Sequence, residues 1–288
     1  MGQILSNKKP KVEQEKPARD EFSPQEYNDD HPGCVSTLRG HTGPIFCVSV
    51  INPTLVVSGS EDWTVGVWVK EDEIDDTETE AGEKQQWHCA HVLEGHKGSV
   101  TCLTHFSLGG DDFIVSGGLD NIIKVWQIAK DLQVAPTCVA TWAAHGDFVF
   151  SLSCYRPTNE DGDRSIRLIS GSNEMSIKLW QLKDDGKKDQ QWECYKTLEG
   201  HEEGVRCLLV LPNRRVLASG AYDNTVRLWD LETGQCLHVL QGHTGIILLT
   251  PIAAKNNNIV DGVLCLCTLL SPLSELGFVL VCHSFYKM

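Results

Sequence analysis

An internal repeat constrains the fold of this chain more than any other feature of its 288 residues. The pair Gly-His occurs four times, and Ala144 with His145 is a variant of it. A segment that starts with Ser-Gly and ends with Trp follows the first four of these five positions. The four segments read SGSEDWTVGVW, SGGLDNIIKVW, SGSNEMSIKLW and SGAYDNTVRLWD. Because self-similarity with a period of roughly 20–50 residues is typical of repeat architectures, the chain is expected to stack similar units against one another.

Apolar and polar residues alternate within each unit with the period of two that β-strands require. In the first unit the runs are 34–38, 45–50, 55–58 and 64–69, and Glu61 with Asp62 forms the turn between the last two. This pattern predicts four strands per unit. A four-stranded twisted sheet buries both of its faces only against neighbouring copies, so the units are expected to stack radially.

Gly-His near the start of a unit, Ser-Gly-x-x-Asp in the middle and Trp or Trp-Asp at its end resemble the WD-repeat family. The resemblance covers residues 34–250 and implies an all-β fold, an incomplete WD-repeat β-propeller with four complete repeats and a truncated fifth. The fifth repeat begins with CLHVLQGHTGIILLT at 236–250 and then loses the pattern. Residues 1–33 are expected to form a disordered arm and 251–288 a divergent apolar tail. Whether such an arc closes, self-associates or needs a partner stays open.

Each complete repeat supplies a His, a Ser, an acidic residue and a Trp, and the resemblance implies that these four side chains form a hydrogen-bonded chain between strands. Serine, histidine and an acid are also the components of a hydrolase triad. Because a catalytic site is built once and this set recurs in every repeat, a structural role is favoured, with no enzyme activity and no cofactor. The third repeat departs from the pattern at Ala144 and Glu174, which leaves its network open. The four sets are His41, Ser58, Asp62, Trp68; His96, Ser116, Asp120, Trp126; His145, Ser170, Glu174, Trp180; and His201, Ser219, Asp223, Trp229.

Cysteines recur at fixed distances from the repeat histidines. One lies seven residues before each histidine and another lies six residues after three of them. Structural zinc requires four convergent ligands, usually in close pairs, and the chain has no C-x2-C pair, so no metal is expected. We predict reduced cysteines that pack as small buried apolar side chains. The two sets are Cys34, Cys89, Cys138, Cys194, Cys236 and Cys47, Cys102, Cys207.

The net charge of −14 argues against nucleic-acid binding, which depends on clustered Lys and Arg. The acidic segment 71–83 is interpreted as a solvated insert between units. We therefore expect other proteins or peptides as partners and a role as an interaction scaffold or adaptor. The alternative is the substrate-recognition subunit of a ubiquitin ligase. Six candidate partner-binding residues either follow a repeat histidine by five positions or precede the turn acid: Phe46, Glu61, Leu119, Phe150, Arg206 and Tyr222.

The first residues, MGQILS, fit the pattern for N-myristoylation, in which Gly2 is acylated after removal of the initiator Met. A single myristoyl chain binds membranes only marginally, so a second signal is needed. Lys8, Lys9 and Lys11 follow and could contact anionic lipids. This pattern predicts a cytoplasmic protein with peripheral membrane contact. The alternative is a free arm with a chance match.

Overall fold

The computed structural model describes residues 36–70, 87–157, 165–183, 191–211, 215–243, 245, 249–253 and 261–265. Within these ranges the chain forms strands, turns and loops and no helix. Predictions for the arm 1–33, for the acidic segment 71–83 and for most of the tail 251–288 concern residues outside the described ranges.

Sixteen of the strands form four antiparallel sheets of four strands, each built in chain order. The first sheet contains β1 (Ile45–Asn52), β2 (Leu55–Ser60), β3 (Val65–Lys70) and β4 (Trp87–Leu93). The second contains β5 (Val100–Leu108), β6 (Asp111–Gly118), β7 (Ile122–Ile128) and β8 (Thr137–Ala143). The third contains β9 (Val149–Tyr155), β10 (Arg167–Ser172), β11 (Ile177–Leu182) and β12 (Trp192–Leu198). The fourth contains β13 (Val205–Leu211), β14 (Val216–Ala221), β15 (Val226–Asp230) and β16 (Cys236–Leu240).

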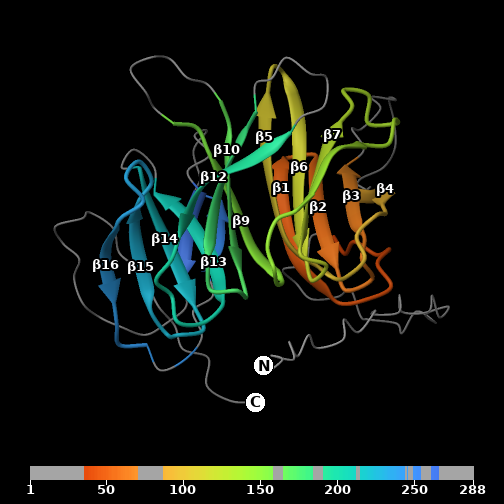
Figure 1. Cartoon of the computed structure of the whole chain (residues 1–288). Coiled ribbons are helices and arrows are strands. Elements are labelled where there is room, and N and C mark those ends of the chain that lie inside the picture. The colour runs from red at the N-terminus through yellow and green to blue at the C-terminus, as the bar shows by residue number, and fades with distance from the viewer. Residues whose placement is uncertain are drawn as a thin grey trace, which may run out of the picture.

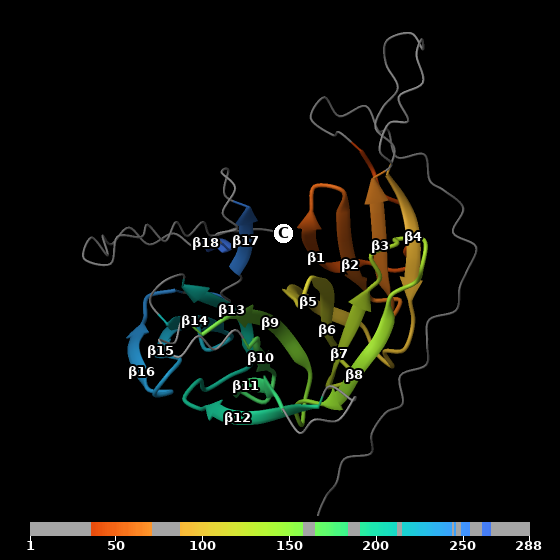
Figure 2. The ribbon, with the colours of Figure 1, turned by 90° about the horizontal axis from the view of Figure 1, so that it is seen from above.

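The four sheets are arranged radially as the blades of a propeller (Figure 1). The first strand of each blade lies on the inside of the arc beside the first strand of the next, so that β1, β5, β9 and β13 follow one another, while β4, β8, β12 and β16 lie on the outside (Figure 2). The blades form an arc and not a closed ring. The structure therefore confirms the expected all-β, incomplete WD-repeat propeller.

Two expectations were wrong: the strand expected at 34–38, and the assignment of the four strands of each sequence unit to one sheet. Residues 36–41 form no strand, and the fourth strand of the first blade is β4, which belongs to the second repeat. The same offset applies to β8, β12 and β16. Each repeat thus begins with the outer strand of the preceding blade, and sequence periodicity cannot reveal this because it defines the length of a unit but not its starting strand.

The hydrophobic core lies between neighbouring blades. One cluster joins Val57, Val65 and Val67 of the first blade to Val100 and Trp126 of the second. Two further clusters join the second blade to the third and the third to the fourth. Successive residues of a strand face the blades on its two sides. Strands with a blade on both sides are therefore almost continuously apolar in sequence.

A fifth, two-stranded sheet follows the four blades. Strand β17 (Leu249–Ala253) pairs antiparallel with β18 (Asp261–Cys265), and this hairpin lies beside β13. Its position in the arc is that of the first half of another blade (Figure 2). The repeat pattern in the sequence ends at about residue 250, whereas the hairpin extends to residue 265.

Candidate functional site

The His, Ser, acid and Trp of each repeat form a continuous hydrogen-bonded chain. In the fourth blade Trp229 Nε1 donates to Ser219 Oγ at 2.7 Å, Ser219 Oγ lies 2.7 Å from His201 Nε2, and His201 Nδ1 lies 2.7 Å from Asp223 Oδ2. An ionised carboxylate only accepts, so the neutral imidazole carries its proton on Nδ1 and Nε2 accepts from the serine hydroxyl. One proton assignment therefore satisfies all four side chains.

The same chain of contacts recurs in the other three blades. The His Nδ1 to acid distances are 2.9 Å for His41 and Asp62, 2.9 Å for His96 and Asp120, and 2.6 Å for His145 and Glu174. The Trp to Ser distances are 2.7 Å for Trp68 and Ser58, 2.9 Å for Trp126 and Ser116, and 2.8 Å for Trp180 and Ser170. The departures in the third repeat leave its network complete, because the longer Glu174 side chain still reaches the histidine.

The turn acid also organises the backbone around it. Asp223 Oδ2 accepts from the backbone N–H of Glu202 at 3.0 Å, and Oδ1 accepts from that of Thr225 at 2.9 Å. Burial by itself would raise the pKa of Asp223, but the hydrogen bonds from His201 and these N–H groups outweigh it and lower the pKa. The carboxylate therefore stays ionised while it joins the loop before the blade to the turn inside it.

Burial also keeps two of the repeat histidines, His145 and His201, neutral. Desolvation lowers the pKa of His201 and of His145, and the hydrogen bonds to Asp223 and Glu174 oppose this shift only in part. The serines at the centre of the four networks are at most 2% exposed. A nucleophile must reach a substrate, so these buried serines, each already accepting from an indole, are unsuited to hydrolysis.

Three of the six candidate partner-binding residues come together where the third and fourth blades meet. The guanidinium carbon of Arg206 lies 3.9 Å from the ring centroid of Phe150 and 5.1 Å from that of Tyr222. The two rings are 6.3 Å apart and meet edge to face. We call these three residues the Arg206 cluster. Phe150 and Arg206 are the second residues of β9 and β13, and Tyr222 follows β14 in the turn that ends at Asp223.

The other three candidates lie elsewhere on the arc. Phe46 and Glu61 belong to the first blade and are exposed, and Leu119 lies in a turn of the second blade. Sequence reasoning missed Phe148, whose ring centroid lies 6.1 Å from that of Phe150. Its position two residues before Phe150, directly ahead of the inner strand β9, is the signal that could have identified it.

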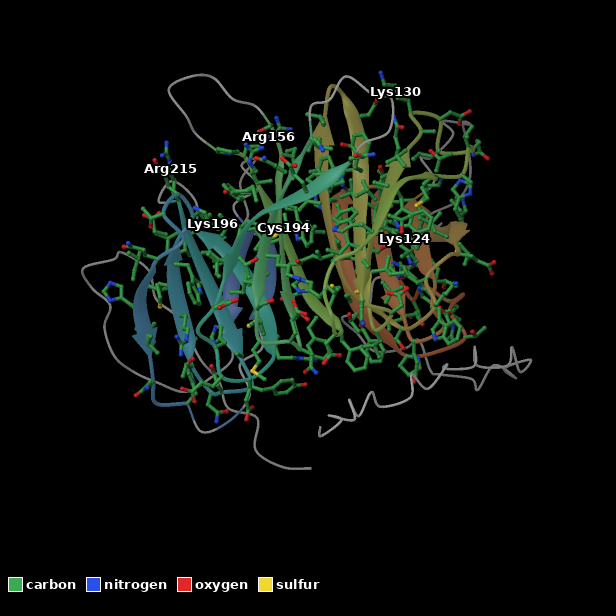
Figure 3. The ribbon with its side chains drawn as sticks, viewed as in Figure 1. Lys124, Lys130, Arg156, Cys194, Lys196 and Arg215 are labelled. Carbon is green, nitrogen blue, oxygen red and sulfur yellow. The ribbon has the colours of Figure 1, made fainter. Side chains whose placement is uncertain are left out.

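The prediction that the repeat cysteines pack as buried apolar side chains holds for two of them and is wrong for three, while Cys47 and Cys89 are half-buried. Cys102 and Cys207 are buried on inner strands. Cys138, Cys194 and Cys236 are exposed on outer strands, and Cys194 lies close to Lys196 on the surface (Figure 3).

The cysteines of the outer strands share a local geometry instead. Each pairs with the repeat Trp at a β-bulge, and its Sγ contacts the carbonyl oxygen two residues further on at 3.4–3.6 Å. These contacts are made by Cys89, Cys138, Cys194 and Cys236. The residue that the bulge leaves outside the ladder is the one after the cysteine, such as Tyr195 between Cys194 and Lys196, and the cysteine side chain folds back along its own strand beside it.

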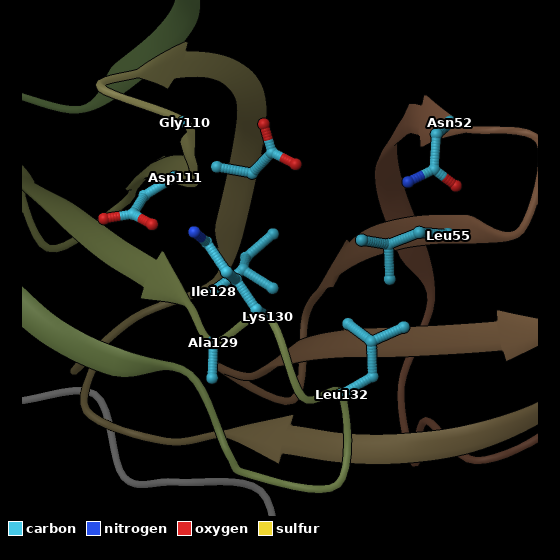
Figure 4. A pocket seen from close by; sticks show the side chains of 9 residues that line it. Asn52, Leu55, Gly110, Asp111, Ile128, Ala129, Lys130 and Leu132 are labelled. Atoms are coloured by element: carbon cyan, nitrogen blue, oxygen red, sulfur yellow. The ribbon is translucent and has the colours of Figure 1, made fainter.

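A small cavity of about 160 Å³ lies between the ends of the first and second blades (Figure 4). Asn52 and Leu55 line it on one side, and Asp111, Ile128 and Lys130 line it on the other. It is smaller than the roughly 300–1,000 Å³ typical of small-molecule sites.

The described part of the chain holds no cluster of three or more His, Cys, Asp or Glu that could bind a metal ion, and no helix there could span a membrane.

The radial four-stranded blades and the repeated buried network define a β-propeller (Figure 2). The family model for the WD domain, G-beta repeat, matches residues 32–69, 87–127, 136–181 and 192–230, which is more than half of the chain. The chain belongs to the WD-repeat family, and proteins of this family are generally non-enzymatic scaffolds.

Several curated proteins are similar to this chain. Human Angio-associated migratory cell protein is 30% identical over 215 residues, covering 73% of this chain and 40% of that protein. Mitochondrial division protein 1 of Mycosarcoma maydis is 30% identical over 228 residues, covering 75% and 24%. Nuclear distribution protein nudF 1 of Talaromyces marneffei is 32% identical over 155 residues, covering 54% and 30%. The chain therefore spans less than half the length of each of these relatives.

Proposed function

We propose that this chain is a non-enzymatic adaptor that binds a protein partner through the Arg206 cluster. The observation that carries the proposal is the stacking of one guanidinium against two aromatic rings from adjacent blades. Arg, Tyr and Phe are enriched at the centres of protein interfaces, where preordered side chains lose little entropy on binding. The cluster lies on the end of the blades where the Gly-His loops and the acidic turns meet.

The chemistry of the cluster favours a partner that presents a carboxylate. Arg206 Nε is buried and makes no hydrogen bond to any described residue. Stacking between the rings holds the guanidinium plane fixed, and a fixed guanidinium binds a carboxylate in a bidentate manner. An Asp or Glu side chain of the partner would accept from the terminal nitrogens of Arg206 while apolar groups beside it cover Phe150 and Tyr222.

Affinity purification of the full chain from cells, with quantitative mass spectrometry, tests this proposal. Arg206→Ala is expected to reduce specific partners at least tenfold, since truncating a central Arg typically costs about 2 kcal/mol or more. Arg167→Ala is the matched control, because Arg167 stacks on Tyr195 in the third blade outside the cluster. Equal recovery of every partner by wild type and Arg206→Ala would contradict the proposal. Ligase subunits among the partners would instead support the role in substrate recognition for a ubiquitin ligase.

We also propose that the chain is held at the cytoplasmic face of a membrane through acylation of Gly2. The support is the sequence MGQILS followed by Lys8, Lys9 and Lys11. Each Lys near an anionic surface adds about 1 kcal/mol to membrane attachment. Metabolic labelling with a myristate analogue and cell fractionation test this directly. Gly2→Ala is expected to lose the label and move to the soluble fraction, and an unlabelled wild-type protein would refute acylation.

A further inference from the structure

A turn of the third blade exposes a large apolar side chain in a strained backbone conformation. Met175 follows the turn acid Glu174, has a φ of 71° and is 47% exposed. Among the described residues of this blade it is the one large apolar side chain that is exposed. The second and fourth blades place Asn121 and Asn224 at this position, and asparagine adopts a positive φ more readily than methionine does. Residues kept in strained conformations cluster at functional sites, so Met175 points to a contact with a partner.

The turn that carries Met175 adjoins the Arg206 cluster. Asn173 in this turn donates its backbone N–H to the carbonyl oxygen of Phe148 at 2.9 Å. The ring centroid of Phe148 lies 6.1 Å from that of Phe150, on which Arg206 stacks. The exposed methionine and the stacked guanidinium therefore belong to neighbouring parts of one surface, at the same end of the third and fourth blades.

An acidic loop runs along the same surface. Glu202 and Glu203 are exposed in the loop that enters β13. The next residue, Gly204, accepts a hydrogen bond from the backbone N–H of Tyr222 at 3.0 Å. A Cβ atom built on Gly204 would lie 2.8 Å from Oδ1 of Asn173. The loop therefore lies between the turn that carries Met175 and the turn that carries Tyr222.

This distribution of charge restricts which partner can bind Arg206. A segment with acidic residues alone would be attracted to Arg206 and repelled by Glu202 and Glu203. A basic residue beside the acidic one removes this conflict, because opposite charges then face each other at both places. Lys and Arg side chains also have a long apolar stem, which can cover an exposed methionine while the charged end stays in water.

We propose that the partner of the Arg206 cluster is a peptide segment in which an acidic residue is accompanied by a lysine or arginine. The acidic residue binds Arg206, the stem of the basic residue covers Met175, and its charge pairs with the acidic loop. Methionine suits this contact because its unbranched, flexible side chain adapts to the shape of the stem. The inference rests on the proposed function and adds the second residue that the partner must carry.

Selection of a random peptide library displayed on phage, with the full chain as the target, tests the proposal. The peptides enriched on wild type are expected to share one Asp or Glu with a Lys or Arg near it. Recovery that is equal on wild type and Arg206→Ala would overturn the proposed function and this inference with it. Peptides that need Arg206 but show no preference for a basic residue would overturn this inference alone.

Two variants locate the basic residue on the surface. A synthetic peptide from the selection should bind Met175→Asn at least about threefold more weakly than wild type, although this substitution should stabilise the protein in urea. Trp63→Asn is the matched control, because Trp63 takes the same left-handed position in the first blade with a φ of 71°. It should bind the peptide like wild type. Equal affinity of wild type and Met175→Asn would remove Met175 from the site and overturn the inference.

Reversal of charge tests the acidic loop. Glu202→Lys combined with Glu203→Lys should weaken binding of the same peptide at least about tenfold at low salt. Glu193→Lys combined with Glu232→Lys is the control, since both residues are exposed at the opposite end of the third and fourth blades. A loss that is the same in the two double variants would reflect net charge alone and would overturn the assignment of the basic residue to this loop.

Discussion

Arg206 on β13 places its guanidinium carbon 3.9 Å from the ring centroid of Phe150 on β9, so that one contact joins the third blade to the fourth. We expect this contact to contribute to stability as well as to binding. A double-mutant cycle of Arg206→Ala and Phe150→Ala in urea unfolding should give a coupling free energy of about 0.5–1 kcal/mol. Strictly additive effects of the two substitutions would show that the stacking contributes nothing in the free protein.

The buried networks should be essential for stability. His201→Ala removes a partner from both Ser219 and Asp223 and should lower the free energy of unfolding by roughly 1–3 kcal/mol. Thermal melting of the purified variant measures this loss. His238→Ala, an exposed histidine on β16, is the control and should melt like wild type. If both variants melt at the wild-type temperature, the network does not stabilise the blade.

Stability should fall as the pH falls below neutrality, in two stages. The pKa of His145 and of His201 is lowered by burial, so protons bind the unfolded chain first and destabilise the fold as the pH drops below about 6.5. The hydrogen bonds to Glu174 outweigh its burial and lower its pKa from 4.5 to about 2, so its stabilising contribution is present above pH 4.5 and is lost between these two values.

Melting temperatures measured from pH 8 to pH 3 report this dependence. Glu174→Gln has no carboxylate to protonate, and its curve should be flatter than that of wild type below pH 4.5. An identical acid limb in the two proteins would show that Glu174 does not contribute to it.

Replacing Met175 with Asn should stabilise the third blade. The residue after the turn acid has a left-handed backbone conformation, with a positive φ, in all four blades. Asn121 and Asn224 take this position in the second and fourth blades. Met175 has a φ of 71° and is 47% exposed, so it strains the backbone without packing in the core. Met175→Asn should raise the free energy of unfolding by about 0.5–1 kcal/mol, measured from the urea midpoint. Val134→Asn, which replaces another exposed apolar residue, should give no gain.

Alkylation should divide the cysteines into two groups. Cys138 and Cys194 are exposed and should react with iodoacetamide at pH 8 within minutes. Burial raises the pKa of Cys47 to about 12 and that of Cys102 well above its ordinary value, so both should stay unmodified in the folded protein. Peptide mapping of the native protein measures each site. Uniform modification would mean that the inner strands open on the timescale of the reaction.

Sequence alone could predict the fold and the members of the four networks, because each is repeated and repetition excludes chance. His145, Ser170 and Trp180 meet as the pattern requires, and the structure adds that Glu174 reaches as far as an aspartate would. The Arg206 cluster could be predicted only in part. Phe150, Arg206 and Tyr222 come from different repeats, and their contact depends on which blade precedes which and on the direction of each side chain.

The exposed cysteines of the outer strands show a second limit of prediction from sequence. The spacing of Cys138 and Cys194 from the histidines is as regular as that of Cys102, yet the first two lie at bulges on the surface and the third lies in the core. Regular spacing shows that positions are equivalent, but it does not show which side of the sheet they face.

Because each repeat begins with the outer strand of the preceding blade, every blade depends on two repeats. The loop at 94–99, which leaves β4 and enters β5, couples the first blade covalently to the second. A chain shortened at a repeat boundary would keep three strands of its last blade and expose the outer edge of the third. Loss of order at one end of the arc should therefore pass to the neighbouring blade, so that tolerance of the protein to truncation is set by where its strands are shared and not by where its repeats end.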